Sequence, residues 1–269
     1  MLLISLVFSC FFPKITLKPY NNSFNSQNFK VKSNGSTTMS QILYILGENF
    51  AKNDPEFIYE KNESGSGAAI TSVISGDSDL GDISRELKQT EISENLGYIT
   101  LATDGIILIL NKKNPISNLT SRQVKDIYEG EIKNWSEINP EINLKITTIG
   151  RENASGTREG FEKTFKIKNS QYEIILPESG DILTKVSSEK SAIGYISFVS
   201  SADSVNTVKI DNIACNYESI KNGSYPATRP FIQVYNKNSK SIALKKWLDF
   251  LHSEHANEII KREKLVDCN

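Results

Sequence analysis

Apolar stretches with strand-like patterning recur along this chain, and most are followed by a short polar turn and then by apolar residues at helical spacing. The strand patterns occupy residues 29–32, 57–60, 79–83, 106–110, 144–149 and 192–198, and residues 226–235 form a further extended stretch. A helix buries residues at offsets of three and four, whereas a strand alternates or, when buried on both faces, is continuously apolar. The repeated order of strand and helix predicts an α/β protein with largely parallel sheets.

Several helices can be placed within this order. One is predicted to bury Met39, Ile42, Leu43, Leu46 and Phe50, and a short one Ala69, Ile70, Val73 and Ile74. Thr120 and Gln123 match a capping box that opens another helix, which Gly130 closes. A long terminal helix is predicted from the stripe Leu244, Trp247, Leu248, Leu251, His255 and Ile259. Trp135 and Trp247 are expected in hydrophobic cores.

Small hydroxyl and glycine residues stand where three of the strands end. They are residues 35–38 (Gly-Ser-Thr-Thr), residues 64–67 (Ser-Gly-Ser-Gly) and the pair Ser84 and Arg85. Taken singly, the first two are more often a helix cap or a turn than a ligand site. Ligands of open α/β sheets gather at the carboxyl ends of strands, so the three turns are predicted to converge on one crevice.

A fourth turn, within residues 150–161, reads Gly-Arg-Glu-Asn-Ala-Ser-Gly-Thr-Arg-Glu-Gly-Phe and joins a strand to a helix. The start of a helix leaves backbone N–H groups unpaired and carries partial positive charge. With two hydroxyls and the guanidinium of Arg151, these donors form a receptor for a tetrahedral oxyanion. The alternative is that Arg151 and Arg158 are solvated charges or partners of Glu152 and Glu159.

The composition is that of a folded, water-soluble protein, with 23% charged and 38% apolar residues among 269. The formal net charge is −1, so no broad basic field argues for nucleic acid or an acidic membrane, and an anion site must be local. His252 and His255 are interpreted as a helix face, and neither a metal nor a cofactor is expected. Cys215 and Cys268 form either a disulfide or two unreactive thiols.

The N-terminus is predicted to direct export. Residues 1–12 are apolar but about half as long as a membrane-spanning helix, as in the core of an export signal. Residues 6–10, Leu-Val-Phe-Ser-Cys, resemble the lipobox of bacterial lipoproteins, in which Cys10 becomes the lipidated first residue. No Lys or Arg precedes this run and Phe8 is bulky for a cleavage site, so lipidation, plain secretion and a mis-assigned start stay open. Residues 13–27 are predicted to be a tether, so that 1–27 form the signal and tether.

The order and spacing of several short motifs resemble the phosphate-binding receptors of bacterial ABC-type phosphate uptake systems, over residues 28–265. The motifs are Gly35-Ser36-Thr37-Thr38, Gly65-Ser66-Gly67, Ile83-Ser84-Arg85-Glu86-Leu87, Asp104-Gly105-Ile106, Asn134-Trp135, Gly150-Arg151, Ala154-Ser155-Gly156-Thr157-Arg158 and Ile193-Gly194-Tyr195. The resemblance implies a two-lobed periplasmic-binding-protein fold of type II, each lobe a mainly parallel sheet flanked by helices, which closes on a ligand. It implies crossings near residues 103–105 and 224–230. The lobes would then be residues 28–104 plus 228–269, and residues 105–227.

The resemblance also implies a set of ligand-binding residues, namely Ser36, Thr37, Thr38, Ser66, Gly67, Ser84, Arg151, Ser155, Gly156 and Thr157. The chain departs from the family pattern at Ser84, where well-known members have an aspartate that accepts the proton of phosphate and repels sulfate. Asp82 and Asp104 are alternative acceptors. Asn153 likewise stands where an acidic partner of Arg151 is expected.

The implied function is that of an extracytoplasmic or periplasmic, monomeric, lipid-tethered solute-binding protein. It would capture inorganic phosphate and deliver it to the permease of an ABC importer. A receptor for sulfate or molybdate is the alternative within this class. An enzyme is disfavoured because Ser155 is not in a nucleophile elbow and no activated nucleophile or cluster of metal ligands is visible. An adhesin or sensor with a vestigial anion site is the remaining alternative.

Overall fold

The computed structural model describes residues 29–267, so the predicted export signal, tether and lipidation at Cys10 lie outside the described residues. The strands are β1 (Lys30–Gly35), β2 (Ile58–Glu63), β3 (Leu80–Ile83), β4 (Leu96–Asn111), β5 (Asn118–Leu119), β6 (Thr147–Arg151), β7 (Ile174–Leu176), β8 (Ala192–Ser197), β9 (Val205–Ile210), β10 (Thr228–Asn236) and β11 (Val266–Asp267). The helices are α1 (Ser40–Ala51), α2 (Ser66–Ser75), α3 (Ser121–Tyr128), α4 (Gly156–Phe165), α5 (Ser179–Ser188), α6 (Tyr217–Lys221), α7 (Ile242–Leu251) and α8 (Glu254–Arg262).

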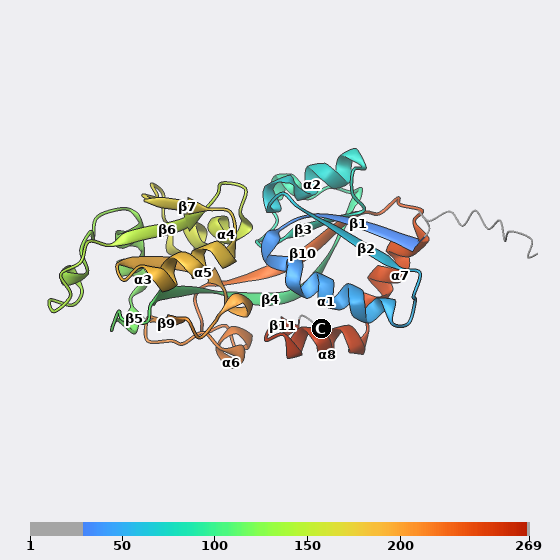
Figure 1. The fold of residues 1–269 in the computed structure, drawn as a ribbon. Helices are drawn as coiled ribbons and strands as arrows, with labels where there is room; N and C mark the ends of the chain where they lie inside the picture. Colours follow the sequence, from blue (N-terminus) through green and yellow to red (C-terminus); the bar gives the residue numbers. More distant parts are fainter. Residues whose placement is uncertain (1–28, 268–269) are drawn as a thin grey trace, which may run out of the picture.

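Two lobes lie side by side, and strands β4 and β10 run from one into the other (Figure 1). The main path through the sheet is β2-β1-β3-β10-β4-β8-β6-β7, while β11 and β9 also pair with β4 and β5 pairs with β9. The outer pairs β1–β2, β1–β3, β6–β7, β6–β8 and β5–β9 are parallel. The pairs that include β4 or β10 are antiparallel. The sheet is therefore mixed, with parallel pairs in the outer part of each lobe and antiparallel pairs where the chain crosses.

The lobe that holds the N-terminal strands has helices on both faces of its sheet. Helices α1, α7 and α8 cover one face, where Val31, Leu43 and Trp247 belong to one buried cluster. Helix α2 covers the other face through Ala69 and Val73. Strand β3 is buried on both sides as a result, which fixes the position of the turn that follows it.

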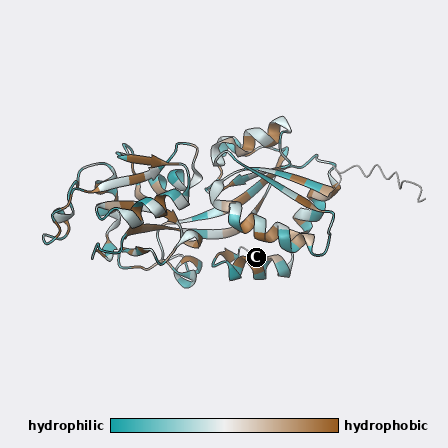
Figure 2. Ribbon diagram, in the orientation of Figure 1, coloured by the Kyte–Doolittle hydropathy of each residue, from teal (hydrophilic) through white to brown (hydrophobic). Residues whose placement is uncertain are grey.

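The second lobe is organised around the apolar half of β4, which is buried on both faces as its continuous hydrophobicity predicts. Ile106, Leu108 and Leu110 pack in one cluster with residues of α3 and α4, whereas Ile107 and Ile109 pack in another with residues of α5. In Figure 2 the hydrophobic colour accordingly follows the strands of this lobe. Because β4 is one continuous strand, it connects this core directly to the core of the other lobe.

The prediction of one long terminal helix is wrong. The chain forms two helices, because α7 ends at Leu251 and Ser253 caps α8 by accepting a hydrogen bond from the N–H of Ala256. His255 consequently lies on the exposed side of α8, with 49% of its side chain accessible. Ile74, predicted on the buried face of α2, is also exposed.

Other local predictions are confirmed. The N–H of Gln123 donates to Thr120 Oγ1 and the N–H of Thr120 to Gln123 Oε1, which is the predicted capping box. Gly130 adopts a positive φ directly after α3. Trp135 and Trp247 are fully buried.

In residues 29–267 no helix has the length and apolar character needed to cross a membrane.

The cysteine prediction stays open. Cys215 is partly buried and forms no disulfide within residues 29–267. Burial raises the pKa of this thiol, and the nearby Asp104 adds to the effect. Cys268 lies outside the described residues.

Candidate functional site

Three serine hydroxyls meet where strands β1 and β3 end and helix α2 begins. Ser36 follows β1, Ser66 is the first residue of α2 and Ser84 follows β3. Ser36 Oγ donates to Ser84 Oγ at 2.9 Å, and the Oγ atoms of Ser66 and Ser84 are 3.3 Å apart. The N–H of Ser84 donates to Ser66 Oγ at 3.1 Å. All three side chains are buried, so the predicted convergence of the three turns is present in the structure.

The Ser36 hydroxyl is not used as a helix cap. Ser36 precedes the first helical start but makes no side-chain capping hydrogen bond there, and Gly65, which precedes α2, has no side chain to make one. Gly35 has a φ of +140°, and a Cβ there would lie 2.3 Å from the carbonyl oxygen of Asp82. The N–H of Ser36 donates to the same carbonyl oxygen at 2.9 Å. The turn after β1 therefore requires glycine and directs the Ser36 hydroxyl toward Ser84.

The second lobe presents Arg151 and the start of α4 to this serine cluster. Arg151 ends β6, and Ser155 caps α4 by accepting from the N–H of Arg158 at 3.3 Å. Since Ser155 Oγ accepts that bond, its hydroxyl hydrogen remains available to another acceptor. Thr157 lies in the first turn of α4, where backbone N–H groups have no partner within the helix. The side chains of Arg151, Ser155 and Thr157 are all buried.

The lobes touch across the site. Thr38 Oγ1 lies 3.0 Å from Thr157 Oγ1, and Arg151 Nη2 donates to Thr37 Oγ1 at 3.0 Å. A Cβ added to Gly156 would lie 2.4 Å from the hydroxyl oxygen of Ser66. These contacts join residues from both lobes, so the structure describes a closed arrangement.

Gly67 makes its contact through the backbone. Its N–H donates to the carbonyl oxygen of Ala154 at 3.2 Å, across the lobe boundary. Its neighbour Gly65 has a φ of +79°, and a Cβ there would lie 2.7 Å from the same oxygen. Gly65 therefore allows the start of α2 to approach residue 154 closely, whereas a Cβ at Gly67 would make only ordinary contact there.

Arg151 has one nitrogen without a partner. Its Nε and Nη2 pair with the carboxylate of Glu152 at 3.1 and 3.2 Å. Its Nη1 is buried and makes no hydrogen bond to any described residue. A buried cationic donor without an acceptor is costly, so Nη1 marks a place for an acceptor that is not part of the chain.

Arg229 of β10 also belongs to this site, although it is absent from the residues predicted from the sequence. Its Nη1 donates to Thr157 Oγ1 at 2.5 Å and to the carbonyl oxygen of Ser84 at 3.2 Å. Its Nε and Nη2 donate to Asp104 Oδ2 at 3.1 and 3.0 Å. Burial raises the pKa of Asp104 and lowers that of Arg229, although each partner opposes the shift of the other. The signal available in the sequence was a single cation within the extended apolar stretch 226–235.

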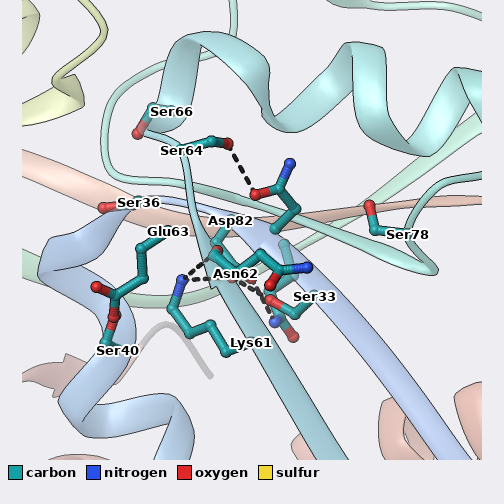
Figure 3. A network of polar contacts seen from close by, with 12 residues as sticks. Ser33, Ser36, Ser40, Lys61, Asn62, Glu63, Ser64, Ser66, Ser78 and Asp82 are labelled. Carbon is teal, nitrogen blue, oxygen red and sulfur yellow. Dashed lines mark hydrogen bonds and ion pairs between the residues drawn. The ribbon is translucent and has the colours of Figure 1, made fainter.

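The two acidic alternatives to Ser84 have other partners. Asp82 is fully buried, with Oδ2 3.1 Å from Lys61 Nζ and Oδ1 accepting from Gln233 Nε2 at 2.7 Å. Figure 3 shows Lys61 extending toward Asp82 from β2. Asp104 is bonded to Arg229, as described above. In the described structure neither carboxylate hydrogen-bonds to Ser84.

Ion pairs line the edge of the contact between the lobes. Arg85 Nε lies 2.7 Å and Lys88 Nζ 3.0 Å from the carboxylate of Glu159 on α4. Arg158 pairs with Glu162 at 2.9 Å, so the alternative pairing of Arg158 with Glu159 is wrong. Glu159 instead connects the second lobe to the segment that follows Ser84.

A cavity of about 230 Å³ adjoins the site between the lobes. Thr37, Thr38 and Gln41 line it from one lobe, and Ser179 and Ser200 line it from the other. Cavities of about 620 and 530 Å³ elsewhere contain none of the predicted site residues in their linings. Within residues 29–267 no group of three or more His, Cys, Asp or Glu side chains is arranged to hold a metal ion.

Two closing lobes with anion donors gathered between them define a solute-binding protein of the periplasmic-binding-protein class. The model of the PBP superfamily domain matches residues 22–255. The phosphate-binding protein PstS of Staphylococcus epidermidis is 30% identical over 226 residues, which are 78% of this chain and 70% of that protein. The chain therefore belongs to the phosphate-binding protein PstS family within this superfamily.

Solved structures confirm the predicted two-lobed fold. A phosphate ABC transporter substrate-binding protein of Clostridium perfringens with bound phosphate shares 37% identity, with 89% of this chain and 100% of that chain covered and a TM-score of 0.82. An ABC-type phosphate transport receptor of Vibrio cholerae shares 28% identity, with 88% and 99% covered and a TM-score of 0.75. These relatives are named for phosphate binding and transport rather than for a reaction.

Proposed function

We propose that this chain captures inorganic phosphate in the cleft between its lobes and delivers it to an ABC importer. The observation that carries the proposal is Nη1 of Arg151, which is buried and has no hydrogen-bond partner within residues 29–267. The neighbouring Nη2 donates to Thr37 Oγ1 in the first hydroxyl-rich turn. The names of the relatives and the phosphate bound in the Clostridium perfringens protein support the same ligand.

The donors that surround this position suit a tetrahedral oxyanion. We infer that the ligand is held by Ser36, Thr37, Thr38, Ser66, Gly67, Ser84, Arg151, Ser155, Gly156 and Thr157. In the closed arrangement described, the N–H of Gly67 is bonded to Ala154, so this residue would have to exchange that bond for one to the ligand. Each charge-assisted hydrogen bond contributes about 1.5–3 kcal/mol, so several suffice for micromolar or tighter binding after the costs of ordering.

Selectivity for phosphate over sulfate requires an acceptor for the proton that phosphate carries. We assign this role to Ser84 Oγ, which accepts from Ser36 and lies within reach of Ser66. A hydroxyl oxygen has two lone pairs and one hydrogen, so Ser84 can accept from Ser36, accept from the ligand and donate to Ser66. Unlike a carboxylate, it carries no charge that repels a fully ionised anion, so discrimination against sulfate and molybdate is expected to be incomplete.

Binding is proposed to close the two lobes, residues 28–104 plus 228–269 and residues 105–227. The distribution of the hydrophobic clusters supports this division. The buried members of one pair of clusters come from residues up to 102 and from 231 onward, and those of the other pair come from residues 106 to 227. The antiparallel pair of β4 and β10 joins them and provides the hinge.

We further propose that the protein acts outside the cytoplasm as a lipid-tethered monomer and that it binds phosphate without turnover. The apolar N-terminus and the lipobox-like sequence at Cys10 support the tether. Mass spectrometry and membrane fractionation of the wild type and of Cys10→Ser test the lipid tether. A lipid adduct absent from the variant is expected.

Equilibrium dialysis tests the ligand. Refolded, phosphate-stripped protein is dialysed against labelled phosphate, with sulfate, arsenate and molybdate as competitors. The proposal expects saturable binding of phosphate, strong competition by arsenate and weaker competition by sulfate. Equal competition by sulfate would contradict specificity for phosphate. Release of a new product would indicate an enzyme. If the protein bound no oxyanion, an adhesin or a sensor would be favoured.

A further inference from the structure

We propose that Arg229 is a positioning residue of the anion site, which aligns the Thr157 hydroxyl toward the bound oxyanion and places the positive end of a buried ion pair beside it. The proposal rests on the function proposed above. Arg229 is 3% exposed and comes from the crossing strand β10, far in sequence from the four hydroxyl-rich turns.

The direction of the hydrogen bonds gives the first argument. A guanidinium can only donate, so Thr157 Oγ1 must be the acceptor in its contact with Arg229 Nη1. The hydroxyl hydrogen of Thr157 must then point elsewhere, and the hydroxyl of Thr38 lies 3.0 Å away on the cleft side. Arg229 thereby leaves the hydroxyl hydrogen of Thr157 free to be donated toward the cleft, which is the role that an anion requires. Arg151 has the same effect on Thr37.

The orientation of the ion pair gives the second argument. Asp104 Oδ2 accepts from Nε and Nη2 of Arg229, on one edge of the guanidinium. Nη1, on the other side, contacts Thr157 and the carbonyl oxygen of Ser84. The pair is therefore a dipole whose positive end faces the donors of the site. In a buried environment such a fixed dipole is little screened by solvent.

The packing around Arg229 holds this geometry. Its guanidinium lies over the ring of Phe231, with the central carbon 5.3 Å from the ring centroid. Ser197 Oγ donates to the same Asp104 oxygen at 2.8 Å. Helix α4 passes over the side chain at Gly160, where an added Cβ would lie 3.8 Å from Arg229 Cδ. Phe231 and Asp104 belong to the same lobe as Arg229, so these two contacts orient the guanidinium before the second lobe closes over it.

A double-mutant cycle separates positioning from general structural support. Inorganic phosphate is titrated calorimetrically into stripped wild-type protein, Arg229→Met, Thr157→Val and the double variant. The matched control is Arg122→Met, whose side chain is 85% exposed and remote from these contacts. Because Arg229→Met leaves Asp104 as an unpaired buried charge, the cycle is repeated with Asp104→Asn added to every member.

The proposal expects Arg229→Met to weaken phosphate binding by about ten- to a hundredfold and the control to leave it unchanged. In the Thr157→Val background the same change should cost much less, because the hydroxyl through which Arg229 acts is already gone. The proposal would be overturned if folded Arg229→Met protein bound phosphate as tightly as its parent, whether that parent carried Asp104 or Asn at position 104. It would also be overturned if the losses of affinity caused by Arg229→Met and Thr157→Val simply added in the double variant. Failure of the wild-type protein itself to bind phosphate would instead contradict the proposed function.

Discussion

The hydroxyl oxygens of Thr38 and Thr157 lie 3.0 Å apart, although the two residues belong to different lobes and are separated by 119 positions in the chain. Thr38 precedes α1 and Thr157 lies in the first turn of α4, so the starts of two helices face each other across the cleft. Both helix starts contribute partial positive charge to the same small volume. Bringing them together is unfavourable in itself, and an anion between them would offset that cost.

Thr38→Val should weaken phosphate binding about tenfold, because the change removes a hydroxyl donor while keeping the shape of the side chain. Calorimetric titration of the stripped protein measures the loss. Thr184→Val is the matched control, because the Thr184 hydroxyl donates to the carbonyl oxygen of Gly180 within α5, away from the cleft donors. Equal affinities for the wild type and Thr38→Val would exclude the Thr38 hydroxyl from binding.

Gly156→Ala should prevent full closure. The new methyl carbon would lie 2.4 Å from Ser66 Oγ and 2.6 Å from Ser84 Oγ, both on the opposite lobe. Small-angle scattering should show compaction of the wild type when phosphate is added and little compaction of the variant, whose affinity should fall at least tenfold.

Gly180→Ala is the control for this change, since an added Cβ there meets nothing within 4 Å. It should close as the wild type does. Normal closure and affinity in Gly156→Ala would show that the two lobes do not approach each other as closely as described.

Glu159→Gln should loosen the closed state modestly. The carboxylate pairs with Arg85 and Lys88 across the lobe boundary but is 39% exposed, so the expected cost is about 0.2–1 kcal/mol, or up to about fivefold in affinity. The dependence of phosphate affinity on salt should also become weaker. Glu173→Gln is the control, because its pair with Lys145 is 42% exposed at the carboxylate and stays within one lobe. A loss of the same size in both variants would rule out a specific role at the lobe boundary.

Asp82→Asn should destabilise the fold rather than change the ligand. Asp82 and Lys61 have fully buried side chains, so the change leaves a buried ammonium without its counter-charge, at a cost of about 3–5 kcal/mol. Urea unfolding of the phosphate-free protein measures this cost. Asp126→Asn, which removes the pair with the solvent-exposed Arg122, should cost less than about 1 kcal/mol. A stable Asp82→Asn protein with altered selectivity would restore Asp82 as the acceptor of the ligand proton.

Local sequence signals were sufficient to predict the four turns of the site. Glycine permits the positive φ that the turns at Gly35 and Gly65 adopt, and Ser155 with the residues after it marks a helix start. The apolar half of β4 was also predicted, because a short continuous apolar run such as residues 106–110 is typical of a strand buried on both faces.

Contacts between residues far apart in the chain could not be predicted from local sequence signals. Arg229 reaches Asp104 over 125 positions and Thr157 over 72, and no local pattern encodes either contact. The terminal helix was predicted as continuous because the apolar spacing carries across residues 252–253, whereas the cap made by Ser253 starts a new helix there. The partner of Glu159 was missed because Arg85 belongs to the other lobe.

Binding of labelled phosphate to Arg151→Ala, compared with the wild type and with Arg122→Ala, tests the central claim most directly. Arg151 carries the buried Nη1 that lacks a partner in the described structure, whereas Arg122 is exposed. The account predicts saturable binding by the wild type and by Arg122→Ala, and no detectable binding by an Arg151→Ala protein that still unfolds cooperatively. Wild-type affinity in folded Arg151→Ala would contradict it.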